Sequence, residues 1–210
     1  MPRLLEVFSG TSSIGKVFRA KGWEVVSIDC DARMQPTIVA DIGTFDYTML
    51  DGYFECIWCS PPCTQYSIAR SHAKTPRDLV GADKLLQRCK DIITHFHPQA
   101  WFIENPYSGL LKGRDVVSEL PYVVVDYCKY GWPYRKRTII FTNATGQRWT
   151  KLCEHDCEAS DGKRHTGWAQ KGNRNEGNGF TREELYAIPP LLCEEIYSAT
   201  CGIIRLSRLA

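Results

Sequence analysis

The sequence has no long apolar segment, little net charge and no repeated or low-complexity tract. No apolar run reaches the ~18 residues that a membrane-spanning helix needs, and the start of the chain lacks the apolar core of a secretory signal. We therefore expect a soluble, intracellular protein without a membrane partner. The net charge of +2 does not by itself indicate a nucleic-acid partner, so local clusters of Lys and Arg must decide.

What is present fits one folded unit. The chain has 210 residues, of which 43% are hydrophobic and 24% charged, which is ordinary for a globular protein and too apolar for a disordered one. We expect a monomer with one catalytic unit. The ten cysteines lie mostly within apolar runs of a chain without a secretory signal, so they are interpreted as reduced thiols, some of which bind metal.

Short apolar runs alternate with segments of helical period, which predicts an α/β fold with a mostly parallel sheet. One such helix is expected near 85–96. The last two predicted strands are joined by only about ten residues, so they should form an antiparallel hairpin at the sheet edge. The predicted strands are Leu4–Phe8, Glu24–Ile28, Cys56–Cys59, Ala100–Ile103, Tyr122–Tyr127 and Thr138–Phe141.

The pattern changes in the last third of the chain. Residues 144–178 are rich in Gly, Asn, Lys, Cys and His and poor in aliphatic residues, which indicates a loop-rich insert. A helical period returns over Arg182–Ile196. We therefore predict a catalytic domain over 1–143, a small insert over 144–178 and a segment over 179–210 that completes the catalytic domain.

The turn after the first strand indicates a cofactor site. Phe8–Gly15 opens a helix, and Asp29 ends the second strand about twenty residues later, where a ribose hydroxyl would lie. The turn has only two glycines and lacks the Gly-x-Gly-x-x-Gly pattern that holds a pyrophosphate, which favours S-adenosylmethionine. A ligand-free turn would look similar. The predicted cofactor residues are Phe8, Ser9, Gly10, Thr11, Ser12, Asp29, Cys30, Asp41, Ile42, Ser60 and Pro61.

Reactive side chains follow the next strands. Cys63 lies in a proline-flanked loop after Cys56–Cys59, and Glu104 ends the following strand, so both should face one pocket at the carboxyl edge of the sheet. The hairpin adds Arg135, Lys136 and Arg137, whose charges can lower the pKa of the cysteine and contact a pyrimidine or phosphates. Judged alone, the pattern favours a structural role for Cys63 over a catalytic one.

The insert contains soft metal ligands. Cys153, Cys157 and His165 have zinc-like spacing in a segment too poor in aliphatic residues to fold by burial. Cys128, on the neighbouring strand, or His155 could be the fourth ligand, and we prefer Cys128 because ligation by Cys153, His155 and Cys157 together would be cramped. The prediction is one structural zinc in a small zinc-knuckle-like module.

In order along nearly the whole chain, these motifs resemble those of the cytosine-C5 DNA methyltransferases. Phe8-Ser9-Gly10, Asp29 and Asp41-Ile42 are similar to the cofactor motifs, Pro62-Cys63 to the nucleophile motif, Glu104-Asn105 to Glu-Asn-Val, and Arg135 to Arg137 to the Arg-x-Arg pair. The resemblance implies a Rossmann-like S-adenosylmethionine-dependent fold and double-stranded DNA as partner. It also implies that Cys63 attacks C6 of a flipped-out cytosine, with Glu104 at N3.

The chain departs from the family pattern at two places. Tyr134 replaces the Gln that usually precedes the arginine pair, with one residue fewer after Pro133, and the large target-recognition domain is reduced to 144–178. Compact viral and phage enzymes are most similar, which would place a phage member in the cytoplasm of a bacterial host. Two alternatives stay open: a methyltransferase acting on transfer RNA, and an inactive zinc-containing DNA-binding homologue. An amino methyltransferase is disfavoured because Cys63 stands where an aromatic residue would follow Pro-Pro.

Overall fold

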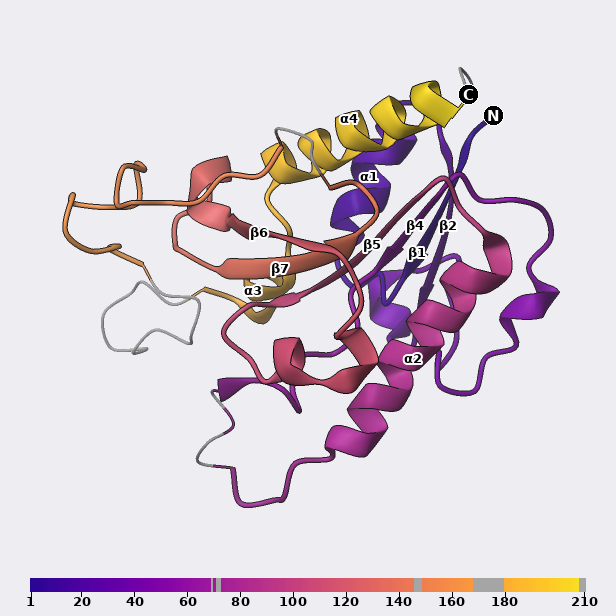
Figure 1. Cartoon of the computed structure of the whole chain (residues 1–210), viewed down its shortest axis with the longest axis horizontal. Coiled ribbons are helices and arrows are strands. Elements are labelled where there is room, and N and C mark those ends of the chain that lie inside the picture. Colours follow the sequence, from indigo (N-terminus) through magenta and orange to yellow (C-terminus); the bar gives the residue numbers. More distant parts are fainter. Residues whose placement is uncertain (69, 71–72, 146–148, 168–179, 208–210) are drawn as a thin grey trace.

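The computed structural model describes residues 1–68, 70, 73–145, 149–167 and 180–207, and its centre is one seven-stranded sheet. The strand order is β3-β2-β1-β4-β5-β7-β6 (Figure 1). The bounds are β1 Arg3–Val7, β2 Glu24–Asp29, β3 Ile38–Val39, β4 Cys56–Cys59, β5 Ala100–Pro106, β6 Tyr122–Asp126 and β7 Arg137–Thr142.

Strands β1 to β5 pair in parallel, whereas β7 runs antiparallel to both β5 and β6. The predicted mostly parallel sheet with an antiparallel edge hairpin is therefore confirmed. In the hairpin, Asp126 pairs with Arg137 and Tyr122 with Phe141. The parallel strands end at one edge of the sheet, so the loops that follow β1, β2, β4 and β5 meet there.

Helices cover both faces of the sheet (Figure 1). On one face, α1 (Ser13–Ala20) packs against α4 (Pro190–Ser207), and on the other lies α2 (Leu79–Phe96). Two apolar clusters result, one under α1 and α4 around Trp58 and Phe102, the other under α2 around Leu5 and Ile57. Short 3-10 helices occupy the connections: η1 Ala32–Met34, η2 Tyr47–Met49, η4 Leu111–Gly113, η5 Asp115–Val117 and η6 Tyr127–Tyr130.

The prediction of one continuous helix over Arg182–Ile196 is wrong. Two helices occupy this region, α3 (Arg182–Tyr186) and α4, because Pro189 and Pro190 interrupt the backbone hydrogen bonds between them. A capping box between Thr181 and Glu184 starts α3. The break places the backbone N–H of Ile188 3.1 Å from Ser13 Oγ, so the last part of the chain closes onto the first helix. None of the helices in the described residues is long and apolar enough to cross a membrane.

Glu6 is a carboxylate within the buried core of β1. Its Oε1 accepts the backbone N–H of Gly15 at 3.1 Å, in the first turn of α1, where Ser12 makes no side-chain cap. A side chain at Gly15 would collide with Glu6 Oε2. Burial raises the pKa of Glu6 to about 7, although the Gly15 N–H and Arg19 act in the opposite direction. The fold therefore favours protonated Glu6, and glycine is required where α1 crosses it.

We predict that Glu6 makes stability depend on pH between about 4.5 and about 7. Because the pKa in the folded state is the higher one, the stabilisation is complete below about 4.5 and is lost as the pH rises through about 7, a loss of roughly 3 kcal/mol. Urea unfolding at several pH values should show this dependence in the wild type and lose it in Glu6→Gln. Glu119→Gln, at an exposed position, is the control; equal pH slopes in wild type and Glu6→Gln would contradict the prediction.

Candidate active site and metal centre

The loop after β1 has an unusual backbone. Phe8, Gly10 and Ser12 all have positive φ, of 57°, 47° and 53°. The N–H of Gly10 donates to Asp29 Oδ2 at 2.8 Å, which joins the ends of β1 and β2, and Asp29 Oδ1 accepts from the N–H of Asp31. Ser9 Oγ is buried with no hydrogen-bond partner among the described residues. A buried hydroxyl without a partner in such a loop fits a site that receives a polar ligand.

An open hollow of about 360 Å³ lies beside this loop, a size that suits a small molecule. Three elements form its walls: the start of α1, the turn after β2, and α3. Trp132 from the β6–β7 connection also lines it, with an indole nitrogen that is buried without a partner among the described residues. The lining residues are Gly10, Thr11, Lys16, Arg33, Met34, Trp132, Glu183, Glu184 and Ala187.

The other predicted cofactor residues lie at the same edge of the sheet, and their side chains differ in solvent exposure. Cys30 and Asp41 are exposed, and Asp41 Oδ1 accepts the N–H of Gly43 in a turn. Ile42 is buried in the core under α2. Ser60 accepts a hydrogen bond from the Trp58 indole at 2.7 Å, just after β4. None of these four residues is among those that line the hollow.

Cys63 lies in the loop after β4, and Asn105 holds that loop. The Asn105 side-chain N–H donates to the carbonyl of Pro61 at 2.9 Å, which ties the loop to β5. Cys63 is half-buried. Burial and the nearby Glu104 raise the pKa of its thiol above the ordinary value, and Lys136 lowers it by less. Of the three hairpin cations considered from the sequence, Lys136 is therefore the one that favours the thiolate.

Glu104 is buried at the end of β5 and has two partners from the hairpin. Tyr127 donates its hydroxyl hydrogen bond to Glu104 Oε1 at 3.2 Å, and the ammonium of Lys136 lies 3.9 Å from the same oxygen. Burial and Glu104 raise the pKa of Tyr127 well above its ordinary value, so Tyr127 stays a donor. Glu104 is near enough to Cys63 to raise the pKa of its thiol, and Tyr127 and Lys136 are further neighbours of Glu104 that the sequence did not indicate.

Arg135 and Arg137 both bind Asp126, which is fully buried. Arg137 donates to the two Asp126 oxygens at 2.9 and 2.8 Å, and Arg135 Nε lies 3.3 Å from Oδ1. Burial alone would raise the pKa of Asp126, but hydrogen bonds from Arg137, the Cys153 N–H and Arg135 outweigh it and hold the pKa below its ordinary value. The arginine pair is thus anchored on an ionised carboxylate.

Four predicted ligands converge at the base of the insert. Cys128, Cys153, Cys157 and His165 each offer one ligand atom, and these atoms lie within 4.8 Å of one another. His165 Nε2 is 3.4 Å from the sulfurs of Cys153 and of Cys157. Sulfur and nitrogen ligands in a tetrahedral zinc site stand about 3.5 Å apart, as bond lengths of about 2.3 and 2.0 Å require. Burial and the neighbouring thiols raise the pKa of Cys128, and the positive charge of a bound cation would lower that pKa again. The donor set fits zinc.

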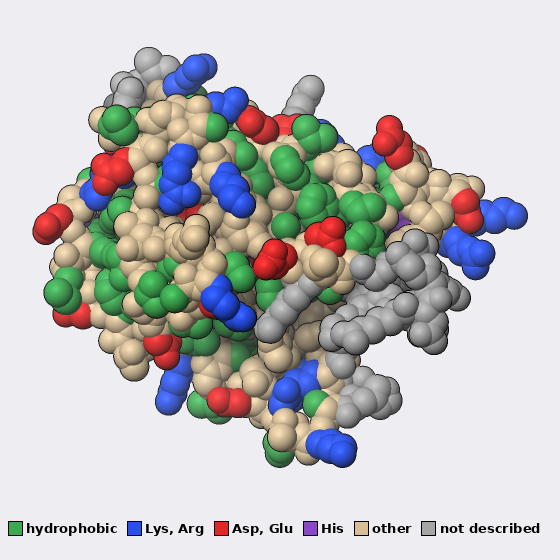
Figure 2. Space-filling view, turned by 180° about the vertical axis from the view of Figure 1, so that it is seen from behind, with side chains coloured by type: hydrophobic (Ala, Val, Ile, Leu, Met, Phe, Trp, Pro, Cys, Tyr) green, Lys and Arg blue, Asp and Glu red, His purple; other side chains and the backbone are tan. Residues whose placement is uncertain are grey.

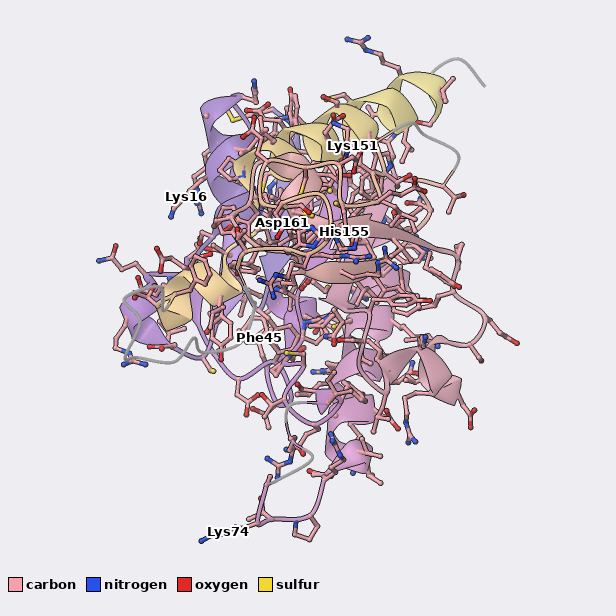
Figure 3. All side chains as sticks on the ribbon, turned by 90° about the vertical axis from the view of Figure 1, so that its left-hand side faces the viewer. Lys16, Phe45, Lys74, Lys151, His155 and Asp161 are labelled. Atoms are coloured by element: carbon pink, nitrogen blue, oxygen red, sulfur yellow. The ribbon has the colours of Figure 1, made fainter. Side chains whose placement is uncertain are left out.

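His155 stands outside this group. Its Nδ1 is 3.5 Å from Ser160 Oγ, and its ring centroid lies 5.0 Å from that of His165. Figure 3 looks at the molecule from the side of the insert and labels His155 and Asp161, which both belong to the insert. Lys163 and Arg164 are exposed, and Figure 2 shows Lys and Arg side chains at the tip of the insert. Lys171 and Arg174, two further basic residues of the insert, lie outside the described residues.

Sequence reasoning missed Asp126, Tyr127 and the α3 wall of the hollow. Asp126 and Tyr127 end a strand that was identified from its apolar pattern alone. The sequence signal that could have identified these two residues is a pair of polar side chains at the end of an apolar strand. The capping residues Thr181 and Glu184 marked the start of α3 but gave no indication of what it covers.

Solved structures similar to this fold are methyltransferases. The chain aligns with EhMeth of Entamoeba histolytica at a TM-score of 0.51 and 16% identity, over 80% of this chain and 57% of that one. It aligns with the Dnmt2 methyltransferase of S. pombe at 0.50 and 15%, over 68% and 50%. The chain therefore spans about half the length of these structures. At such low identity the likeness shows the fold alone, which is the predicted methyltransferase fold.

Comparison of sequences adds a relative of the same size. No family model matches the chain. The "Probable DNA (cytosine-5)-methyltransferase" of Frog virus 3 (isolate Goorha) is 31% identical over 217 residues, covering 92% of this chain and 98% of that protein. Its viral source agrees with the predicted resemblance to compact viral enzymes. The chain belongs to the DNA (cytosine-5)-methyltransferase family.

Proposed function

We propose that this protein transfers a methyl group to C5 of cytosine in double-stranded DNA, with Cys63 as the nucleophile. The observation that carries the proposal is the convergence of Cys63 and Glu104 at the carboxyl edge of the sheet, next to the loop with the partnerless Ser9 hydroxyl. The similarity to the frog virus protein, whose name specifies DNA and cytosine C5, supports this substrate.

The loop after β1 and the adjacent hollow would hold S-adenosylmethionine. The backbone of Phe8 to Ser12, Asp29 and the α3 wall would bind it. The resemblance assigns the adenine contact to Asp41 and Ile42, which are not among the residues that line the hollow. When bound, the cofactor supplies an electrophilic methyl group on a sulfonium centre. The chain's own residues must then make cytosine C5 nucleophilic.

Cytosine C5 is a poor nucleophile and needs covalent activation. The Cys63 thiolate adds to C6, and electron density rises at C5 and N3. Glu104, held by Tyr127, is placed to donate a proton or hydrogen bond at N3 and so stabilise the adduct. The resemblance assigns Arg137 to the cytosine O2 and Arg135 to the cysteine loop. Both guanidinium groups are instead held on Asp126, so Lys136 is the hairpin cation that the proposal places at the reactive pair.

DNA would meet two projecting arms. The insert and the loop before α2 extend from the same side of the molecule, with His155 on the first and Lys74 at the tip of the second (Figure 3). Exposed Lys163 and Arg164 on the insert can bind phosphates. Because C6 is inaccessible within a duplex, the target base must flip out, at a cost of a few kcal/mol that phosphate and pocket contacts offset. Such a small insert can touch few base pairs, so the recognition sequence should be short.

We predict that Cys63→Ala abolishes methyl transfer while cofactor binding survives. Without the thiolate, C5 is not activated, and the transfer of labelled methyl groups to DNA should fall by at least ~10³-fold. Bisulfite sequencing of the DNA product would report the site as well as the activity. Cys201→Ala, on α4, is the matched control and should keep wild-type activity. A Cys63→Ala protein with wild-type turnover would refute the central proposal.

We predict that Glu104→Gln leaves DNA binding intact and slows turnover by roughly 10²-fold, since the amide cannot supply a proton at N3. Single-turnover methylation separates this chemical step from product release. A duplex containing 5-fluorocytosine should still trap the wild-type protein covalently, which an inactive DNA-binding homologue would not do. Transfer RNA offered in competition tests the alternative substrate. Equal single-turnover rates for Glu104→Gln and wild type would reject the role at N3.

We predict one structural zinc per chain, bound by Cys128, Cys153, Cys157 and His165. Metal analysis of the chelator-washed protein should give about one equivalent, and His165→Ala should lose the metal and melt at a lower temperature. His155→Ala is the matched control, because His155 is a nearby histidine outside the ligand group, and it should retain zinc. Less than half an equivalent in the wild type, or equal loss in both variants, would contradict the assignment.

A further inference from the structure

The three consecutive cations of the hairpin separate onto two sides of the chain. Side chains alternate along an extended segment. Accordingly, Arg135 and Arg137 reach Asp126, whereas Lys136 between them lies 3.9 Å from Glu104 Oε1. One hairpin segment therefore lies against two different carboxylates, and Lys136 is the cation next to Glu104, the carboxylate at the reactive centre.

Lys136 is held unusually firmly for a lysine. Only 15% of its side chain is exposed. The ammonium lies 4.9 Å from the centre of the Tyr127 ring and 3.4 Å from the carbonyl oxygen of Leu185, which it approaches as a hydrogen-bond donor. Burying a cation to this extent is costly unless a negative charge compensates it. The position of Lys136 is explained if the neighbouring site carries one negative charge.

We propose that Lys136 is the counter-ion of the Cys63 and Glu104 pair, compensating one negative charge that moves between them. The inference rests on the proposed role of Cys63. At rest the charge is on Glu104. When the thiol proton passes to the Glu104 carboxylate, an S–H bond breaks, an O–H bond forms and the charge moves to sulfur. The total charge stays the same, and Glu104 then carries the proton that N3 requires.

The pKa of Cys63 supports this arrangement. Burial and Glu104 raise it, whereas the charge of Lys136 and a backbone hydrogen bond at Cys63 lower it. The titratable groups in contact with Lys136 are Glu104 from β5 and Tyr127 from η6. Without Lys136, the backbone hydrogen bond at Cys63 would be left to oppose burial and Glu104. Lys136 is thus a positioning residue that acts through charge on the nucleophile and its partner.

The test measures the reactivity of Cys63 itself, without DNA or cofactor. Iodoacetamide alkylation of the Cys63 peptide is followed by mass spectrometry from pH 6.5 to 10. Lys136→Met should move the rate profile to higher pH, with alkylation at pH 8 roughly threefold to tenfold slower. Lys136→Arg keeps the charge and should restore the rate to within about twofold. Lys136→Gln is a second neutral variant should the Met variant not fold.

Lys21→Met removes the same charge from a partly exposed lysine paired with Glu194 on α4, and should leave the profile unchanged. Coincident profiles for wild type and the neutral Lys136 variants, with native melting temperatures, would overturn the proposal. So would a shift of equal size in Lys136→Arg. Alkylation does not depend on methyl transfer, so a shifted profile in a protein that methylates no DNA would support the counter-ion and reject the proposed function. A wild type that methylates DNA, together with Lys136 variants whose alkylation profiles do not shift, would support the proposed function and reject the counter-ion.

Discussion

Asp126 is the buried charge on which the arrangement of the site depends. Its carboxylate accepts from Arg135, Arg137 and the backbone N–H of Cys153, so one side chain connects the edge hairpin to the base of the Cys and His cluster. A buried carboxylate must be compensated, and here the compensation comes from two separate segments of chain. The insert is thereby fixed relative to β7, and with it the basic surface that would approach DNA.

Much of the fold and the site could be predicted because the signals are local. Strand β4 was predicted with its observed bounds, since Cys56–Cys59 is a short apolar run. Cys128 was the preferred fourth member of the Cys and His cluster and does lie in that cluster, although it belongs to η6 and not to the neighbouring strand. What could not be predicted depends on side-chain direction. Nothing in the order Arg135-Lys136-Arg137 indicates which cation meets Glu104. Pro189 and Pro190 indicate the break in the last helix, but the prediction followed the helical period of the apolar residues instead.

The small size of the chain gives several of its elements two tasks. Helix α3 has only five residues, yet with the start of α1 it lines the hollow, and its Leu185 carbonyl receives Lys136. Trp132 lines the same hollow from the hairpin that carries the arginine pair. The frog virus relative is of nearly equal length, so at least one family member shares this small size.

The alternation of the hairpin cations makes their roles sensitive to chain length. Adding or removing one residue between Pro133 and β7 would reverse the direction of every side chain up to the first residue fixed in the sheet. An arginine would then face Glu104, and a lysine would face Asp126. Since this chain has one residue fewer than its family at this point, matching motif letters in an alignment is not enough to transfer an arginine's role. The identity of a motif residue does not by itself fix the direction in which its side chain leaves the strand.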